Sequence, residues 1–152
     1  MMQDNTLLLV EDNADDEALA MRAFRNSEHV SKVVVVRDGA EALDYLFGTG
    51  QYSGRDTGDQ PRLILLDMKL PKLNGLDVLR RIRQDERTRY HPVVLMTSSR
   101  QETDIIAGYS LGANSYIQKP VNFDEFVESM RDLGRYWMQI NRTPNLAINN
   151  RN

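Results

Sequence analysis

Chemically useful side chains stand where the apolar runs of this sequence end. Glu11 and Asp12 follow the first run, Asp67 follows the third, Thr97 ends the fourth and Lys119 follows the fifth. If these runs are parallel strands of one sheet, their carboxyl ends lie along one edge, where such sheets hold their functional crevice. We therefore expect three carboxylates, a hydroxyl group and an ammonium group to meet there.

This set of groups is suited to phosphoryl transfer. Carboxylates held close together repel one another, so they need protons or a neutralising cation. Because the ligands are oxygens, without His or Cys, the cation should be a hard ion, and Mg²⁺ suits such a site. Lys119 cannot bind the metal, but it can pair with an anion brought to the site. In phosphoryl transfer the protein mainly positions groups and neutralises charge on the transferring oxygens.

Asp67 is the predicted phosphoryl acceptor. It follows the central predicted strand and precedes a turn at Met68–Pro71 that leaves its carboxylate exposed. A carboxylate is a known covalent acceptor in such chemistry. Glu11 and Asp12, which are adjacent in the sequence, would then hold the metal.

The elements that must position these residues are five short runs, each nearly continuous in apolar character, as in strands covered on both faces. The runs are Thr6–Val10, Lys32–Val36, Arg62–Leu66, Val93–Thr97 and Ser115–Gln118. Segments with helical spacing of apolar residues lie between and after them, least clearly over residues 101–110. The alternation predicts a doubly wound α/β fold of five parallel strands with helices on both faces.

Length and composition limit the function classes. The 152 residues fit one domain. The chain has no cysteine, which excludes a disulfide framework and a thiolate site. A formal net charge of -3 argues against nucleic acid as the main partner. Because no run approaches the roughly 18 apolar residues of a membrane span and the start is unlike a signal peptide, we expect a cytoplasmic protein without a membrane partner.

Other segments carry no predicted chemistry. The glycine-rich connection over residues 48–61 is expected to be a mobile surface loop. Residues 141–152, with five asparagines, are expected to be a flexible C-terminal tail after a domain at residues 5–140. The two histidines, His29 and His91, lie away from the acidic residues in the predicted topology and receive no role. The arginine-rich third helix is interleaved with acids and is expected to be a solvated face.

At the residues that could do chemistry, the chain resembles a response-regulator receiver domain. The matching pieces are Val10-Glu11-Asp12-Asn13, Leu65-Leu66-Asp67-Met68, Leu70-Pro71, Asn74-Gly75, Met96-Thr97, and Tyr116 with Lys119-Pro120. Thr97 lies 30 residues after Asp67, and Lys119 lies 22 after Thr97, which is the family's usual spacing. The resemblance covers about residues 5–138 and implies a flavodoxin-like (βα)5 fold.

The resemblance also implies roles at the metal site. Asp67 would receive a phosphoryl group from a phosphohistidine on a sensor histidine kinase. Mg²⁺ would be bound by the carboxylates of Asp12 and Asp67 and by the backbone carbonyl of Lys69, with Glu11 acting largely through water. Glu11 replaces the more frequent aspartate, and Lys69 is a bulky cation in a slot that influences dephosphorylation in the family.

Further implied roles concern the phosphoryl group and the response to it. Thr97 would hydrogen-bond the phosphoryl group, and Lys119 would form an ion pair with it. Tyr116 resembles the aromatic switch residue, which turns inward when Thr97 moves toward the phosphoryl group. The Lys119–Pro120 peptide bond is usually cis in the family. Ser98 stands where alanine or glycine is common.

A narrower resemblance concerns the partner. The opening Val10-Glu11-Asp12-Asn13-Ala14-Asp15-Asp16 and the long connection before the third strand are similar to stand-alone receivers that partner bacterial phytochromes and related histidine kinases. Only 32 residues follow Pro120, and the fifth predicted helix uses more than half of them. We therefore expect signalling through the receiver's own surface or through onward phosphotransfer, without a separate output domain.

The end of the fifth predicted helix is apolar. Tyr136, Trp137, Met138 and Ile140 extend past the stripe that would cover the sheet. One interpretation is a homodimer through the fourth helix, the fifth strand and the fifth helix. The other is that Trp137 folds back on the core.

Two further functions stay open at this point. A pseudo-receiver would keep the fold and signal without phosphorylation, but the intact acceptor, acids, hydroxyl and lysine speak against it. An unrelated enzyme on a flavodoxin-like fold would bind flavin or act as an aspartate-dependent phosphatase. Glu11 and Asp12 would repel a flavin phosphate, and Lys69 occupies the place of the phosphatase's usual second acid.

Overall fold

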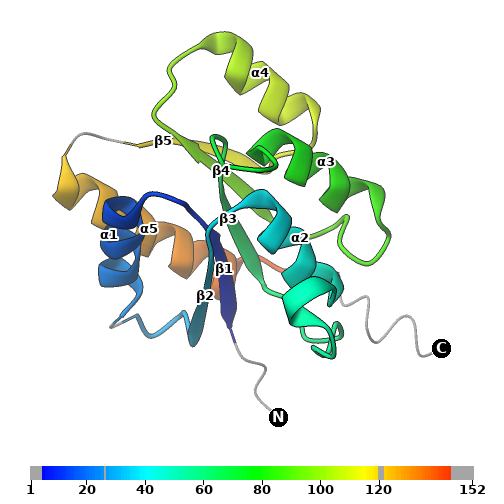
Figure 1. Ribbon diagram of the computed structural model, residues 1–152. Helices are drawn as coiled ribbons and strands as arrows, with labels where there is room; N and C mark the ends of the chain where they lie inside the picture. The colour runs from blue at the N-terminus through cyan, green and yellow to red at the C-terminus, as the bar shows by residue number, and fades with distance from the viewer. Residues whose placement is uncertain (1–4, 26, 120–121, 145–152) are drawn as a thin grey trace.

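A computed structural model describes residues 5–25, 27–119 and 122–144 (Figure 1). Five parallel strands form one sheet in the order β2-β1-β3-β4-β5. The strands are β1 (Thr6–Val10), β2 (Lys32–Val36), β3 (Leu63–Asp67), β4 (Val93–Thr97) and β5 (Ser115–Gln118). The predicted α/β class and strand number are confirmed. The third strand lies one residue later than predicted, so Asp67 is its last residue.

Helices cover both faces of the sheet, with α1 and α5 on one side and α2, α3 and α4 on the other (Figure 1). They are α1 (Ala14–Phe24), α2 (Gly39–Phe47), α3 (Gly75–Gln84), α4 (Glu102–Ser110) and α5 (Phe123–Arg135), and a π-helical turn, η2 (Tyr136–Ile140), follows α5. No helix among the residues that the structure describes is long and apolar enough to cross a membrane.

Side-chain caps fix where four of the helices begin. Asn13, Asp38, Asn74 and Asn122 each accept a hydrogen bond from the backbone N–H three residues later. Such caps satisfy N–H groups that have no partner inside the helix. Asn13, Asp38 and Asn74 follow β1, β2 and the loop after β3. Their caps therefore set the direction in which α1, α2 and α3 leave the carboxyl edge of the sheet. Helix α4 has no side-chain cap and buries only Gly108.

The core has two layers, one on each face of the sheet. Leu7 and Leu9 pack with α1 and α5, whereas Leu8 and Val10 pack with α2 and α3. Every residue of β1, β3 and β4 is buried. This two-sided burial explains why the strands read as nearly continuous apolar runs, since alternate side chains point to opposite faces.

The connection between α2 and β3 is held to α2 by side-chain contacts, and its predicted mobility stays a prediction. It contains a short 3-10 helix, η1 (Gly50–Tyr52). Arg55 Nε donates to the Tyr45 carbonyl at 2.7 Å, and its guanidinium lies 4.0 Å from the centre of the Tyr45 ring. Gln60 Nε2 donates to the Leu46 carbonyl at 3.0 Å. Two polar side chains thus bind the loop to the carboxyl end of α2.

Two sequence predictions fall on residues outside the described ranges. The cis geometry expected of Lys119–Pro120 involves Pro120, and most of the expected C-terminal tail lies at residues 145–152. Regular structure ends at Ile140, and residues 141–144 have none. The boundaries of the domain at residues 5 and 140 stay a prediction.

Gly75 allows α3 to begin close beneath the end of β3. Its N–H donates to the Met68 carbonyl at 2.9 Å. A Cβ at this position would overlap the Asp67 carbonyl oxygen and lie 2.7 Å from the Met68 Cα. Because these neighbours are backbone atoms of the segment that carries Asp67, they cannot give way without moving the acceptor.

We therefore expect Gly75→Ala to lower the free energy of unfolding by about 1–3 kcal/mol, the usual cost of overpacking. Gly58→Ala is the matched control, because its Cβ would approach only the flexible Asp56 carboxylate, at 3.1 Å. The control should change stability by less than about 0.5 kcal/mol. Urea denaturation of both variants measures this difference, and equal stabilities would contradict the packing argument.

Candidate functional site

Pairing between β1 and β3 brings the acidic residues together at one edge of the sheet. Val10 lies beside Leu66 in the parallel register, so the next residues, Glu11 and Asp67, are neighbours across the strands. Each of Glu11, Asp12 and Asp67 has a carboxylate oxygen within 4.8 Å of those of the other two. Glu11 and Asp67 are 1% and 5% exposed, so the exposure predicted for the Asp67 carboxylate is wrong, whereas Asp12 is open to solvent.

Lys119 reaches this cluster from the end of β5. Its N–H donates to the Thr97 carbonyl at 2.8 Å and continues the ladder between β4 and β5. Its ammonium Nζ donates to Glu11 Oε1 at 2.7 Å, to Asp67 Oδ2 at 2.8 Å and to Asp16 Oδ2 at 2.8 Å. An ammonium group has three N–H donors. All three donors of Lys119 are therefore used by carboxylates.

Burial and charge shift the pKa values of these groups in linked ways. Burial raises the pKa of Glu11 to about 8, the hydrogen bond shared with Asp67 adds to the rise, and Lys119 opposes it. Burial alone would lower the pKa of Lys119, but its hydrogen bonds to Asp16, Asp67 and Glu11 raise that pKa above the usual range. Burial and the neighbouring Asp67 therefore favour the protonated form of Glu11, whereas the carboxylate contacts of Lys119 favour its charged form.

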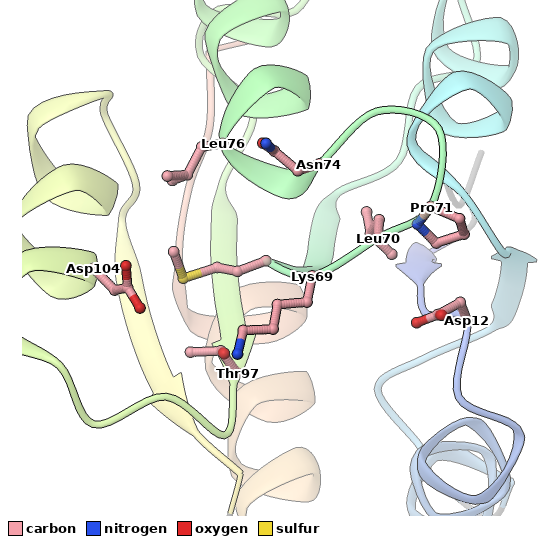
Figure 2. Close-up of a pocket in the computed structure, with 9 residues that line it drawn as sticks. Asp12, Lys69, Leu70, Pro71, Asn74, Leu76, Thr97 and Asp104 are labelled. Carbon is pink, nitrogen blue, oxygen red and sulfur yellow. The ribbon is translucent and has the colours of Figure 1, made fainter.

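An open pocket of about 480 Å³ lies beside the cluster, between the loop after β3 and the loop after β4 (Figure 2). Asp12, Lys69 and Thr97 line it, and Figure 2 shows the Lys69 side chain pointing toward Thr97. The backbone N–H of Lys69 donates to Asp67 Oδ1 at 3.0 Å, which orients the carboxylate. The metal role implied for the Lys69 backbone carbonyl stays a prediction.

Thr97 and Tyr116 contact the same residue, Ser99. Thr97 Oγ1 accepts a hydrogen bond from the Ser99 N–H at 3.1 Å, and Tyr116 Oη donates to the Ser99 carbonyl at 3.4 Å. Ser99 Oγ in turn donates to Asp104 Oδ2 of α4 at 2.6 Å. The backbone at Ser99 is thus a direct connection between the two residues for which the sequence predicts a switch.

Sequence reasoning missed three polar residues of this region: Asp16, Ser99 and Asp104. Asp16 lies on the first turn of α1, and its closeness in the sequence to Glu11 and Asp12 was the one local signal for it. Ser99 and Asp104 join a loop to a helix, and no local periodicity indicates that contact.

The histidines and the arginine-rich helix lie outside the site. His91 Nε2 is 2.9 Å from Gln60 Oε1, and burial lowers the pKa of His91 to about 4. On α3, Arg80 pairs with Asp77 at 2.9 Å. Arg83 donates to backbone carbonyls of the two neighbouring loops. The basic residues of α3 are therefore largely engaged within the protein.

The doubly wound sheet presents buried carboxylates and a lysine at the carboxyl ends of its strands. The chain belongs to the family of response regulator receiver domains, whose sequence pattern matches residues 7–131. It is thus a receiver-domain response regulator of two-component signalling. The resemblance inferred from the sequence is confirmed.

Individual relatives refine this assignment. The probable methanogenesis regulatory protein FilR2 of Methanothrix harundinacea is 40% identical over 141 residues, or 93% of this chain and 88% of that protein. The phosphorylated cyanobacterial phytochrome response regulator RcpA is 37% identical, with a TM-score of 0.86, over 93% of this chain and 99% of that chain. Mn²⁺-bound Rcp1 of Synechocystis is 33% identical, with a TM-score of 0.85, over 92% and 99%. The similarity to phytochrome-associated regulators is therefore confirmed.

The donor set fits a divalent cation. Glu11, Asp12 and Asp67 offer only carboxylate oxygens, which hard cations prefer, and the exposed Asp12 leaves the cluster open to solvent. A dication would offset the repulsion among the carboxylates and favour the ionised form of Glu11.

Lys119→Met tests how much the ammonium group of Lys119 stabilises the fold by offsetting the charge of the carboxylate cluster. The change leaves Glu11, Asp16 and Asp67 without their shared cation, and breaking a largely buried ion pair costs about 3 kcal/mol. We expect that loss in the free energy of unfolding at pH 7 with EDTA present. Lys72→Met is the control: Lys72 is 71% exposed and pairs with Asp38 at 3.4 Å. A loss in Lys119→Met no larger than in the control would contradict the compensation.

Proposed function

We propose that the protein is a cytoplasmic response regulator that accepts a phosphoryl group on Asp67 from a sensor histidine kinase in a Mg²⁺-dependent reaction. It then signals by protein–protein contact or passes the phosphoryl group onward. The observation that carries the proposal is the 2.8 Å contact between Lys119 Nζ and Asp67 Oδ2, inside a carboxylate cluster suited to a dication and beside an open pocket.

The chemistry would proceed by attack of an Asp67 carboxylate oxygen on phosphorus. The new O–P bond forms as the P–N bond of the kinase phosphohistidine breaks, and the imidazole nitrogen leaves with its electron pair. Bound Mg²⁺, held by Asp12, Asp67 and the Lys69 carbonyl with Glu11 acting through water, would supply positive charge to the phosphoryl oxygens. Lys119 would pair with one of the phosphoryl oxygens and give up its present contact with Asp67 Oδ2.

The response to phosphorylation would run through Ser99. When Thr97 Oγ1 turns to hydrogen-bond the phosphoryl group, its contact with the Ser99 N–H breaks. The loop after β4 then moves, and the Tyr116 hydroxyl loses its acceptor, the Ser99 carbonyl. Tyr116 is half-buried at the edge of the core, so its ring can turn inward. This sequence of contacts would connect Asp67 to the surface formed by α4 and β5.

The proposed kinase partner is a bacteriophytochrome or a related histidine kinase. Support comes from the similarity to the phytochrome response regulator RcpA over nearly the whole of both chains. FilR2, which matches at similar length, is described as a methanogenesis regulator. These relatives share the receiver domain with this chain but serve different signals. We therefore assign the input signal to the partner kinase.

Labelling with a small phosphodonor tests the acceptor without a kinase. With acetyl phosphate and Mg²⁺, we expect a mass increase of one phosphoryl group that is stable in acid and labile in base, as for an acyl phosphate. Asp67→Asn should abolish it, and EDTA should suppress it. Asp59→Asn, at an exposed loop position, is the control and should label like the wild type. Labelling that persists in Asp67→Asn would sink the assignment.

We also propose a homodimer through α4, β5 and α5. Ile106 and Tyr109 lie one turn apart on α4 and are 56% and 51% exposed, so this helix presents apolar surface outward. At the other end, Met138 is buried and Trp137 packs partly against the core, in line with the alternative interpretation of that segment. The face on α4 therefore carries the dimer proposal.

Light scattering after gel filtration tests the dimer. The measured mass should rise toward twice the monomer mass with protein concentration, more so after phosphorylation. Ile106→Glu and Tyr109→Glu should each keep the protein monomeric, because a charge would be buried in the interface. Tyr90→Glu, at a 50% exposed position outside this face, should leave the mass unchanged. A monomer mass at every concentration, phosphorylated or not, would overturn the proposal.

A further inference from the structure

Asp16 is a partner of Lys119 that the proposed chemistry leaves without a role. The cap formed by the Asn13 side chain, which accepts from the Asp16 N–H at 3.0 Å, fixes Asp16 on the first turn of α1. Its Oδ2 lies 2.8 Å from Lys119 Nζ, and its side chain is 28% exposed. The cap uses only the Asp16 backbone, so the carboxylate is free to bind Lys119.

The three partners of Lys119 are not equivalent. Glu11 and Asp67 belong to the carboxylate group that can hold a metal ion, whereas Asp16 is outside that group within the described part of the chain. A bound dication, held directly by Asp67 and through water by Glu11, would therefore draw on the same two carboxylates as Lys119. Without Asp16, every carboxylate that Lys119 contacts would also be claimed by the metal.

Charge balance leads to the same point. Glu11, Asp12, Asp16 and Asp67 together can carry four negative charges, and Lys119 carries one positive charge. A dication raises the positive charge to three and places like charges a few ångströms apart, where their repulsion is strong in a partly buried site. The Asp16 carboxylate stands beside the ammonium and offsets this repulsion from outside the metal group.

We propose that Asp16 is a positioning residue that holds Lys119 when a metal ion draws on the carboxylate of Asp67 directly and on that of Glu11 through water. It thereby lets the dication and the ammonium occupy the site together, with the ammonium still beside Asp67. The inference rests on the metal-dependent acceptor function proposed above and adds to it a residue outside the acceptor, the metal ligands and the phosphoryl contacts.

Calorimetric titration of the full chain with MgCl₂ tests this role without any phosphoryl transfer. Asp16→Asn keeps the shape of the side chain and removes its charge. The matched control is Asp15→Asn, which removes the same charge from an exposed position on the same helical turn. We expect Asp16→Asn to weaken Mg²⁺ binding about tenfold relative to Asp15→Asn, as for residues that support a metal site from outside.

A second pair of variants asks whether Asp16 acts through Lys119. In a Lys119→Met background the lysine no longer competes for the metal ligands, so Asp16→Asn should weaken Mg²⁺ binding no more than Asp15→Asn does. This is a double-mutant cycle read out as a dissociation constant. An equally large effect of Asp16→Asn with and without Lys119 would overturn the proposal, because Asp16 would then act directly on the metal.

The outcomes separate this inference from the proposed function. Wild-type protein that fails to bind Mg²⁺ would overturn the metal-dependent function, and the positioning role with it. Wild-type binding together with equal affinities of Asp16→Asn and Asp15→Asn would overturn the positioning role alone. Asp16→Glu restores a carboxylate on a longer arm, and we expect it to recover at least part of the affinity lost in Asp16→Asn.

Discussion

The structure depends on the compensation of buried carboxylates by one ammonium group. The parallel pairing of β1 and β3 places Glu11 and Asp67 side by side, where both are almost fully buried. Like charges in such a place destabilise the fold unless a cation or a proton offsets them. Lys119 supplies the cation from β5, with all three of its N–H donors engaged. The strand order is therefore also an electrostatic requirement.

The same constraint prepares the site for chemistry. In the proposed reaction, a dication would offset the charge of the carboxylates, and a phosphoryl oxygen would replace one of the carboxylate contacts of Lys119. The hydrogen bonds at Ser99 connect the neighbouring hydroxyl, Thr97, with Tyr116 and, through Asp104, with α4. A small shift of Thr97 would thus displace α4, the helix in which only Gly108 is buried.

Family and partner are decided by different parts of the molecule. The receiver chemistry lies at the carboxyl edge of the sheet, and the described relatives range from phytochrome regulators to a methanogenesis regulator at similar identity. We propose that partner choice depends on surface outside this edge, such as the exposed side chains of α1, α4 and the segment after α5.

The sequence by itself determined the alternation of strands and helices and the residues at the strand ends. Two-sided burial produces continuous apolar runs and helices produce a periodic spacing of apolar residues, and both are local patterns. The sequence also placed Glu11, Asp67, Thr97 and Lys119 at one edge. Only the tertiary structure decided that Asp16, 103 residues before Lys119, completes the ammonium's contacts, that Ser99 joins Thr97 to Tyr116, and that Arg55 binds the glycine-rich loop to α2. Such contacts depend on how distant elements pack, and no local periodicity records them.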